Sequence, residues 1–167
     1  KDLNFGISNS NYYEKIETNS SASDRQKAQE GDYWDTFVKL NIDLDKRNQR
    51  FRTTEGYRSS YGIDMPVISE TNTLTNSYNF KYFTELYEDN ISSLSLFLQT
   101  ANSLTGDDIK LSERLYVPSS KLRGFEKGKV GPKDGSDFVG GNFVTAFNVA
   151  TTLPQILPNV EDVDINL

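Results

Sequence analysis

Five segments of the chain alternate between apolar and polar side chains at every second position. They span residues 36–45, 57–67, 78–86, 92–100 and 143–149. Successive side chains of a β-strand point to opposite faces, so this period of two predicts five strands. A weaker alternation at Leu3, Phe5 and Ile7 predicts an earlier strand, and residues 163–167 resemble the start of a further one.

The strand-like segments match a membrane-spanning strand in length, because a tilted strand crosses a bilayer in about 9–11 residues. Their polar faces carry mid-strand charges at Lys39, Asp43, Arg58, Asp64, Lys81 and Glu85. Aromatic residues gather near the strand ends, at Tyr12, Tyr13, Tyr33, Trp34, Tyr78 and Tyr87. A wet lumen and two aromatic girdles are typical of outer-membrane barrels. A soluble β-sandwich also alternates in this way and stays open as the alternative at this point.

The connections between these segments alternate between long and short. The long ones span residues 17–33, 66–76 and 105–141, and the shorter ones span 46–56, 88–90 and 151–162. Outer-membrane barrels have long extracellular loops and short periplasmic turns, which places the three long connections outside. Ser23 and Gln26 form a candidate capping box for a short helix in the first long loop, although a plain solvated loop fits equally well.

Composition narrows the function. The 167 residues include 24 acidic and 18 basic ones, and the net charge of −6 argues against nucleic-acid binding. The chain has no Cys and no His, so it lacks the commonest general base and the commonest zinc ligands. We therefore expect no enzyme activity, no metal and no cofactor. No apolar run approaches the roughly 20 residues of a membrane-spanning helix.

Both ends of the chain fall where strand-like sequence is expected. Lys1 is not an initiator methionine, no signal segment precedes it, and the chain stops within residues 163–167. We therefore expect a fragment of a longer protein.

The connection 105–141 is far longer than an ordinary loop, which predicts a functional loop or a disordered one. Residues 122–142 within and beside it read LRGFEKGKVGPKDGSDFVGGN, and this density of Gly with one Pro argues for defined turns. Arg123 stands between apolar Leu122 and Phe125. This placement predicts that its guanidinium enters a partly buried, acidic place.

Three motifs in this stretch carry a family resemblance. They are Leu122-Arg123-Gly124-Phe125, Val130-Gly131-Pro132 and Gly140-Gly141-Asn142. Together they resemble the sixth extracellular loop of the BamA family, the central insertases of the β-barrel assembly machine. The first motif alone is shared with two-partner-secretion and TamA-like relatives, whereas the other two favour BamA.

A second patch resembles a periplasmic turn of the same family. It comprises Asp45, Lys46, Arg47 and Asn48, followed by Phe51, Thr54 and Gly56. Thr53 stands where the family usually has proline. The resemblance covers the whole chain in strand order, from the middle of the barrel onward.

The resemblance implies a fold, a cellular location and a function. The expected fold is all-β: an antiparallel transmembrane barrel, here a partial barrel of about six to seven strands, with the loop 105–141 folded toward the lumen. Residues 1–167 would form part of one barrel domain in the bacterial outer membrane, without its periplasmic repeats and terminal strands. The expected function is insertion of nascent outer-membrane β-barrel proteins into the bilayer, together with accessory lipoproteins and without covalent chemistry.

The resemblance also implies a role for Arg123, which in the family pairs with carboxylates on inward positions of later strands. The Glu usual on the next strand is replaced here by Ala150, and the other acidic partner would lie beyond Leu167. Asp43, Asp64 and Glu85 are the candidate partners within this chain.

Two rival functions remain. A two-partner or TamA-like secretion pore has the same fold and passes a substrate through the lumen or the seam. A passive porin or adhesin would use its loops to bind external ligands. The latter predicts a variable loop in place of the three motifs.

Overall fold

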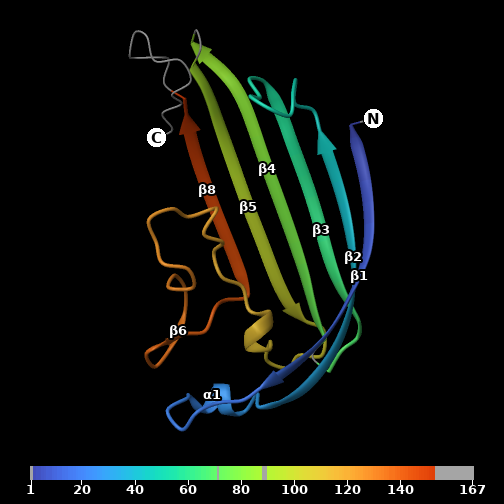
Figure 1. Cartoon of the computed structure of the whole chain (residues 1–167), viewed down its shortest axis with the longest axis vertical. Coiled ribbons are helices and arrows are strands. Elements are labelled where there is room, and N and C mark those ends of the chain that lie inside the picture. Colours follow the sequence, from blue (N-terminus) through green and yellow to red (C-terminus); the bar gives the residue numbers. More distant parts are fainter. Residues whose placement is uncertain (1, 71, 88–89, 153–167) are drawn as a thin grey trace.

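The computed structural model describes residues 2–70, 72–87 and 90–152, which form one curved antiparallel sheet (Figure 1). Its six strands follow one another in the order β1-β2-β3-β4-β5-β8. They are β1 (Leu3–Ile16), β2 (Gly31–Asp45), β3 (Gly56–Ile68), β4 (Thr73–Tyr87), β5 (Asn90–Ser103) and β8 (Phe143–Thr151). The loop before β8 holds a small hairpin of β6 (Lys133–Asp134) and β7 (Asp137–Phe138). The all-β prediction is confirmed.

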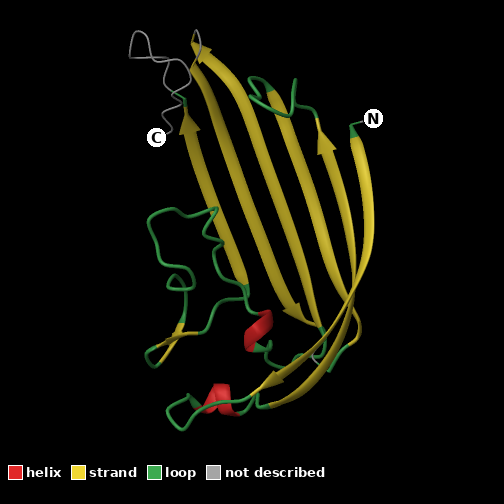
Figure 2. Cartoon of the chain, viewed as in Figure 1, coloured by secondary structure: helices red, strands yellow, loops and turns green. Residues whose placement is uncertain are grey.

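In the described residues, helical structure is confined to two short pieces, α1 (Asp24–Lys27) and the 3-10 turn η1 (Leu111–Glu113) (Figure 2). The predicted capping box is present, because Ser23 Oγ accepts the Gln26 N–H at 3.3 Å and Gln26 Oε1 accepts the Ser23 N–H at 3.0 Å. Within the described residues, no helix has the length and apolar character to cross a membrane.

All six predicted strands that lie within the described residues are present, and most extend beyond the predicted bounds. The largest difference is β1, where three alternating residues indicated a strand that runs for 14. Its pairs with β2 continue from Leu3↔Leu44 to Ile16↔Gly31. Polar Asn9 and Asn11 occupy the outward positions beyond Ile7, so the apolar alternation fades while the pairing continues. Residues 163–167 lie outside the described part.

The connections fall at two ends of the sheet (Figure 1). Residues 17–30, 69–70, 72 and 104–142 lie at one end, and the turn of residues 46–55 lies at the other. The long connection predicted at 66–76 is wrong, because β3 runs to Ile68 and β4 starts at Thr73. The predicted connection began at Pro66. This proline pairs with Phe37 beside a bulge of β2, past the Asp64↔Thr75 pair of β3 and β4. A proline is tolerated in a strand at such a place.

The apolar positions form continuous rows across one face of the sheet. One row joins Phe5, Ile42, Tyr61, Tyr78 and Leu98 through successive strand pairs. Phe5 is 74% exposed and Phe147 62%. Apart from the β6–β7 hairpin of the loop, the described residues form no second sheet that could cover this face. The soluble sandwich alternative is therefore wrong, and the apolar rows face outward from a partial barrel wall.

Aromatic side chains mark both ends of this outward face. Tyr13 and Trp34 are in ring contact at 5.3 Å near one end, and Tyr57 pairs with Tyr82 near the other. Along β2 the outward face runs for ten residues from Trp34 to Leu44. Ten residues of a strand tilted by about 40° rise about 25 Å, so the height of this face equals that of the apolar band of outer-membrane barrels.

Candidate functional site

The loop of residues 104–142 packs against the inward face of β5 and β8. Ile109 and Leu115 of the loop form a buried cluster with Phe97, Ala101 and Val144 of the wall. Each of these five side chains is at most 8% exposed. The sequence predicted that the inward face contacts water. This is true only in part, because the patch under the loop is apolar and buried. This patch holds the loop by burial of apolar surface.

Backbone bonds fasten the same end of the loop. Leu115 and Gly141 exchange two N–H···O bonds of 2.8 and 2.9 Å, and the Asn142 carbonyl accepts the Ala101 N–H at 2.8 Å. Gly140 has φ +69°, and a Cβ there would lie 3.0 Å from Leu115 O and from the Arg114 side chain. A side chain at position 140 would separate the two segments, which gives the first glycine of the third motif a physical reason.

The three loop motifs lie together. The Pro132 carbonyl accepts the N–H of Val139, the residue just before the third motif, at 3.0 Å and so brings the second motif beside the third. Leu122, Phe125 and Val130 line one small cavity, which connects the first motif to the second. The structure thus brings the predicted motif residues into one folded unit.

Arg123 has surroundings that differ from the predicted acidic place. It is exposed and lines an open cavity of about 800 Å³ on the inward face. The cations lining this cavity are Arg47, Arg58, Lys81, Lys121 and Arg123. None of its described lining residues is acidic. The cavity lacks an acidic lining because the inward side chains at this height of the wall are basic or neutral. The neutral ones include Ser95, Asn148 and Ala150.

The candidate partners of Arg123 are occupied or lie elsewhere. Asp43 accepts a bond from Arg58 Nε at 2.8 Å, and Asp64 is paired with Lys39 Nζ at 2.7 Å. Glu85 pairs with Ile91 near the far end of β4. Within the described ranges Arg123 forms no ion pair, so its clasp role stays a prediction.

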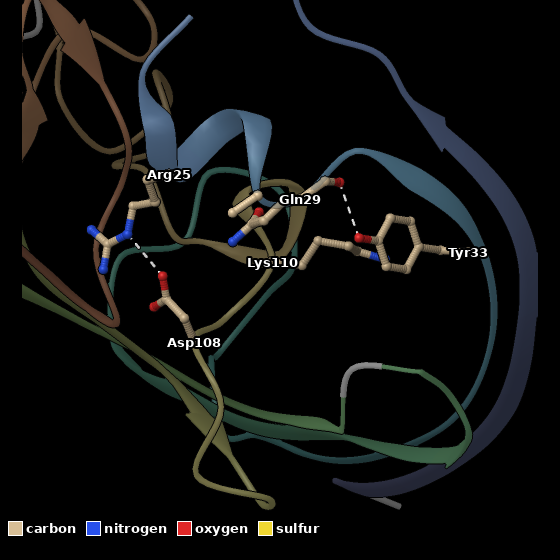
Figure 3. A pocket seen from close by; sticks show the side chains of 6 residues that line it. Arg25, Gln29, Tyr33, Asp108 and Lys110 are labelled. Carbon is tan, nitrogen blue, oxygen red and sulfur yellow. Dashed lines mark hydrogen bonds and ion pairs between the residues drawn. The ribbon is translucent and has the colours of Figure 1, made fainter.

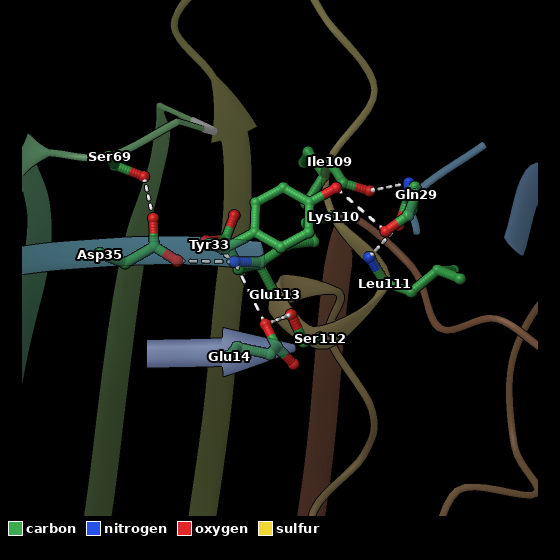
Figure 4. Close-up of polar contacts among 10 residues, drawn as sticks. All are labelled: Glu14, Gln29, Tyr33, Asp35, Ser69, Ile109, Lys110, Leu111, Ser112 and Glu113. Carbon is green, nitrogen blue, oxygen red and sulfur yellow. Dashed lines mark hydrogen bonds and ion pairs between the residues drawn. The ribbon is translucent and has the colours of Figure 1, made fainter. Parts of the chain in front are cut away.

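Lys110 is the most strongly held charge of the loop, and sequence reasoning missed it (Figure 4). Its side chain is 1% exposed. The ammonium lies 2.6 Å from Asp35 of β2, 3.2 Å from Glu14 of β1 and 3.6 Å from Glu113 of η1. The Tyr33 ring centroid lies 4.5 Å away. Buried charges need such compensation, because an unpaired ion in a dry place is very costly.

The carboxylates around Lys110 are themselves held in place. Ser69 donates to Asp35 Oδ1 at 2.5 Å, and Ser112 donates to Glu14 Oε2 at 2.8 Å. Burial works to lower the pKa of Lys110. The hydrogen bond to Asp35 and the charges of Glu113 and Asp35 outweigh it, so the pKa is raised above its usual range. The ammonium therefore stays charged at every physiological pH.

Polar contacts from the first loop brace both sides of Lys110 (Figures 3 and 4). Gln29 Oε1 accepts the Leu111 N–H at 2.7 Å, and Gln29 Nε2 donates to the Ile109 carbonyl at 3.4 Å. Arg25 pairs with Asp108 at 2.8 Å beside a cavity of about 270 Å³. The two loops are thus joined at this end of the barrel wall.

A sequence signal for Lys110 existed. Lys110 stands between apolar Ile109 and Leu111, as Arg123 stands between apolar Leu122 and Phe125. The pattern of a strong donor with apolar neighbours is therefore shared by both residues, and only Arg123 also belongs to a family motif.

The turn of residues 46–55 is organised by one side chain. Asn48 Oδ1 accepts backbone N–H groups of Gln49, Thr54 and Glu55 at 2.9, 3.3 and 3.4 Å. Asn48 Nδ2 donates to Thr54 Oγ1 at 2.5 Å. Arg47 is held by Asp45 through two bonds of 2.8 Å, so the matched polar residues serve turn geometry. Phe51 is 88% exposed at the tip.

Gly56 closes this turn at a position where the neighbouring backbone leaves no room for a side chain. A Cβ at this position would lie 2.2 Å from the Lys46 carbonyl, and φ is +97°. We expect Gly56→Ala to destabilise the barrel by more than the roughly 1–3 kcal/mol of a strained φ alone, because the turn backbone must also move. Gly106→Ala is the control, since Gly106 has φ +87° with no atom near its Cβ position. Urea unfolding of both variants measures the difference, and equal losses would show that the close contact is relieved at no cost.

Comparison with known proteins identifies the chain's relatives. The model of the Omp85 superfamily domain matches residues 2–163. A SAM50-like protein of Schizosaccharomyces pombe is 37% identical over 70 residues, which are 41% of this chain. The aligned part is 14% of that relative's length, well under two thirds of it.

Proposed function

The chain belongs to the Omp85 superfamily of outer-membrane proteins, and on this basis we propose that it forms part of the wall of an insertase for β-barrel proteins. The superfamily includes both insertases and secretion pores. The alignment with a SAM50-like protein favours the insertase. The observation that carries the proposal is a wall with apolar outward rows whose inward face holds the motif-bearing loop.

Insertion of this kind needs no covalent chemistry. An incoming strand satisfies its backbone N–H and C=O groups by pairing with an exposed strand edge. In hydrocarbon this pairing matters, because each unpaired group costs several kcal/mol. The seam between the first and last strands, which the BamA resemblance implies, would supply this edge. The six strands described here would supply the wall beside it.

The finer assignment is a BamA-type insertase of the bacterial outer membrane. It rests on the three loop motifs and on the polar turn built around Asn48, both of which were expected from that family. Its partners would be nascent outer-membrane barrel proteins, accessory lipoproteins and the bilayer itself. Detection of the protein in an isolated bacterial outer-membrane fraction tests the location, and its recovery from another membrane would overturn it.

Folding of a client in liposomes tests the insertase directly. The intact protein is reconstituted, a urea-unfolded barrel client is added, and folding is followed by the gel shift of unboiled samples. We expect client folding to be several-fold faster than in empty liposomes. Transport of a passenger without faster folding would indicate a secretion pore, and steady ion conduction without either would indicate a porin.

We also propose that Arg123 pairs with a carboxylate from another part of the barrel. Five cations line the cavity around it. Arg47 and Arg58 are already paired with Asp45 and Asp43, so the remaining repulsion is among Lys81, Lys121 and Arg123, and an acidic group there would relieve it. Arg123→Ala should therefore loosen the tip of the loop and increase protease cleavage between residues 122 and 130 in whole cells. Lys129→Ala is the control, because Lys129 lies over the Phe138 ring at 5.8 Å and away from this cavity. Equal cleavage of wild type and Arg123→Ala would defeat the clasp.

A further inference from the structure

The loop of residues 104–142 contacts two parts of the wall that are not neighbours. Ile109 and Leu115 pack on Phe97 and Val144 of β5 and β8. Lys110 binds Glu14 of β1 and Asp35 of β2. In the sheet, β3 and β4 separate β2 from β5. The loop therefore spans the curve of the sheet from one side to the other (Figure 1).

Backbone geometry explains how one short segment reaches both sides. Lys110 has φ −54° and ψ 138°, close to polyproline II backbone. Such backbone has three residues per turn, so successive side chains point in clearly different directions. Ile109 enters the apolar cluster of β5 and β8, so the next side chain points away from it, toward β1 and β2. Gln29 fixes this arrangement by bonding both the Ile109 carbonyl and the Leu111 N–H.

We propose that Lys110 is a positioning residue that makes the loop a cross-brace of the barrel wall. Its ammonium holds β1 and β2 at a set distance from β5 and β8, at the end of the barrel opposite the turn of residues 46–55. All residues of the brace lie within the described part of the chain, and none of the contacts named above involves Arg123. The brace therefore acts independently of Arg123. The proposal concerns the shape of the wall and holds whether the barrel inserts clients or secretes a substrate.

The chemistry at Lys110 suits a brace better than a surface ion pair does. The side chains of Lys110 and Asp35 are 1% and 0% exposed, whereas those of the wall pair Lys39 and Asp64 are 39% and 33% exposed. Solvent and salt weaken an exposed pair and have little access to a buried one. The buried pair therefore keeps its geometry while the lumen around it is wet.

A distance measurement across the sheet tests the brace. The chain has no Cys, so spin labels at Ile7→Cys on β1 and Phe143→Cys on β8 are unique within it. Both positions face outward and are exposed, by 76% and 59%. Pulsed electron paramagnetic resonance on the intact protein in bilayers gives the distribution of distances between them. We expect Lys110→Met to lengthen and broaden this distribution, whereas Lys39→Met, which removes the wall pair, leaves it unchanged.

The outcome is decisive in either direction. An unchanged distribution in Lys110→Met that still shows the folded gel shift overturns the brace, as does an equal change in Lys39→Met. If Lys110→Met does not assemble, Asp35→Asn is measured in the same way, because it removes the nearest countercharge and keeps the side-chain shape. An unchanged distribution in that variant overturns the proposal as well. Client folding in liposomes is measured separately, so failure of the brace and failure of the insertase are distinguishable.

Discussion

Replacing Asp35 with alanine is expected to lower the free energy of unfolding of the barrel by about 3–5 kcal/mol, because it leaves a buried ammonium without its main countercharge. Asp35 has a fully buried side chain that lies 2.6 Å from Lys110 Nζ. The other carboxylates lie farther away, at 3.2 and 3.6 Å, and Glu14 is 29% exposed. Ser69 would lose its acceptor as well.

Urea unfolding followed by the fluorescence of Trp34, the single tryptophan of the chain, measures this effect. Asp64→Ala is the matched control, because Asp64 also pairs with a lysine at 2.7 Å but is 33% exposed. Exposed pairs contribute about 0–1 kcal/mol, so the control should lose little. Similar losses in both variants would mean that burial of the Lys110 cluster adds nothing to its strength.

A lysine at Leu96 is expected to destabilise the folded barrel by about 2–4 kcal/mol, the cost of a charge on the lipid-facing side near mid-bilayer. Leu96 lies in the middle of β5, between Phe80 and Phe147 of the neighbouring strands. These three side chains belong to one outward row. A long lysine could reach water only by extending toward an interface.

Ser60→Lys is the control for Leu96→Lys. Ser60 is on the inward face of β3, opposite Asp43 and Asn79, and lines the open cavity of about 800 Å³. Its lysine would extend into this open space at small cost. The free energy of folding into bilayers, from urea titration, gives both values. Equal costs at the two positions would contradict the assignment of the faces.

The strands and their faces were accessible from the sequence, because a period of two is a direct consequence of strand geometry. The exceptions have local causes. Asn9 and Asn11 interrupt the apolar face of β1, although its pairing with β2 continues to Ile16. The predicted connection 66–76 began at Pro66, yet β3 continues to Ile68 beyond its last pair with β4, Asp64↔Thr75.

The site was accessible only in part. The loop motifs indicated where the chain folds onto the wall, and Gly140 has the close contacts that its residue type suggested. Lys110 was missed because its partner Asp35 is 75 positions away, and a strand pattern gives the face of a residue but not its depth. The same limit explains why the surroundings of Arg123 differ from the predicted acidic place. They depend on which inward side chains lie at the same height of the wall, and a strand pattern does not show this.

Solvent accessibility along β2 tests the central claim most directly, because it separates the two faces residue by residue. Spin labels are placed singly at positions 38 to 43 of the intact protein in bilayers, and their collision rates with oxygen and with a water-soluble nickel complex are measured. An outward apolar face predicts high oxygen access at 38, 40 and 42 and high nickel access at 39, 41 and 43. Low access to both reagents at 40 and 42, as in a dry protein interior, would contradict it.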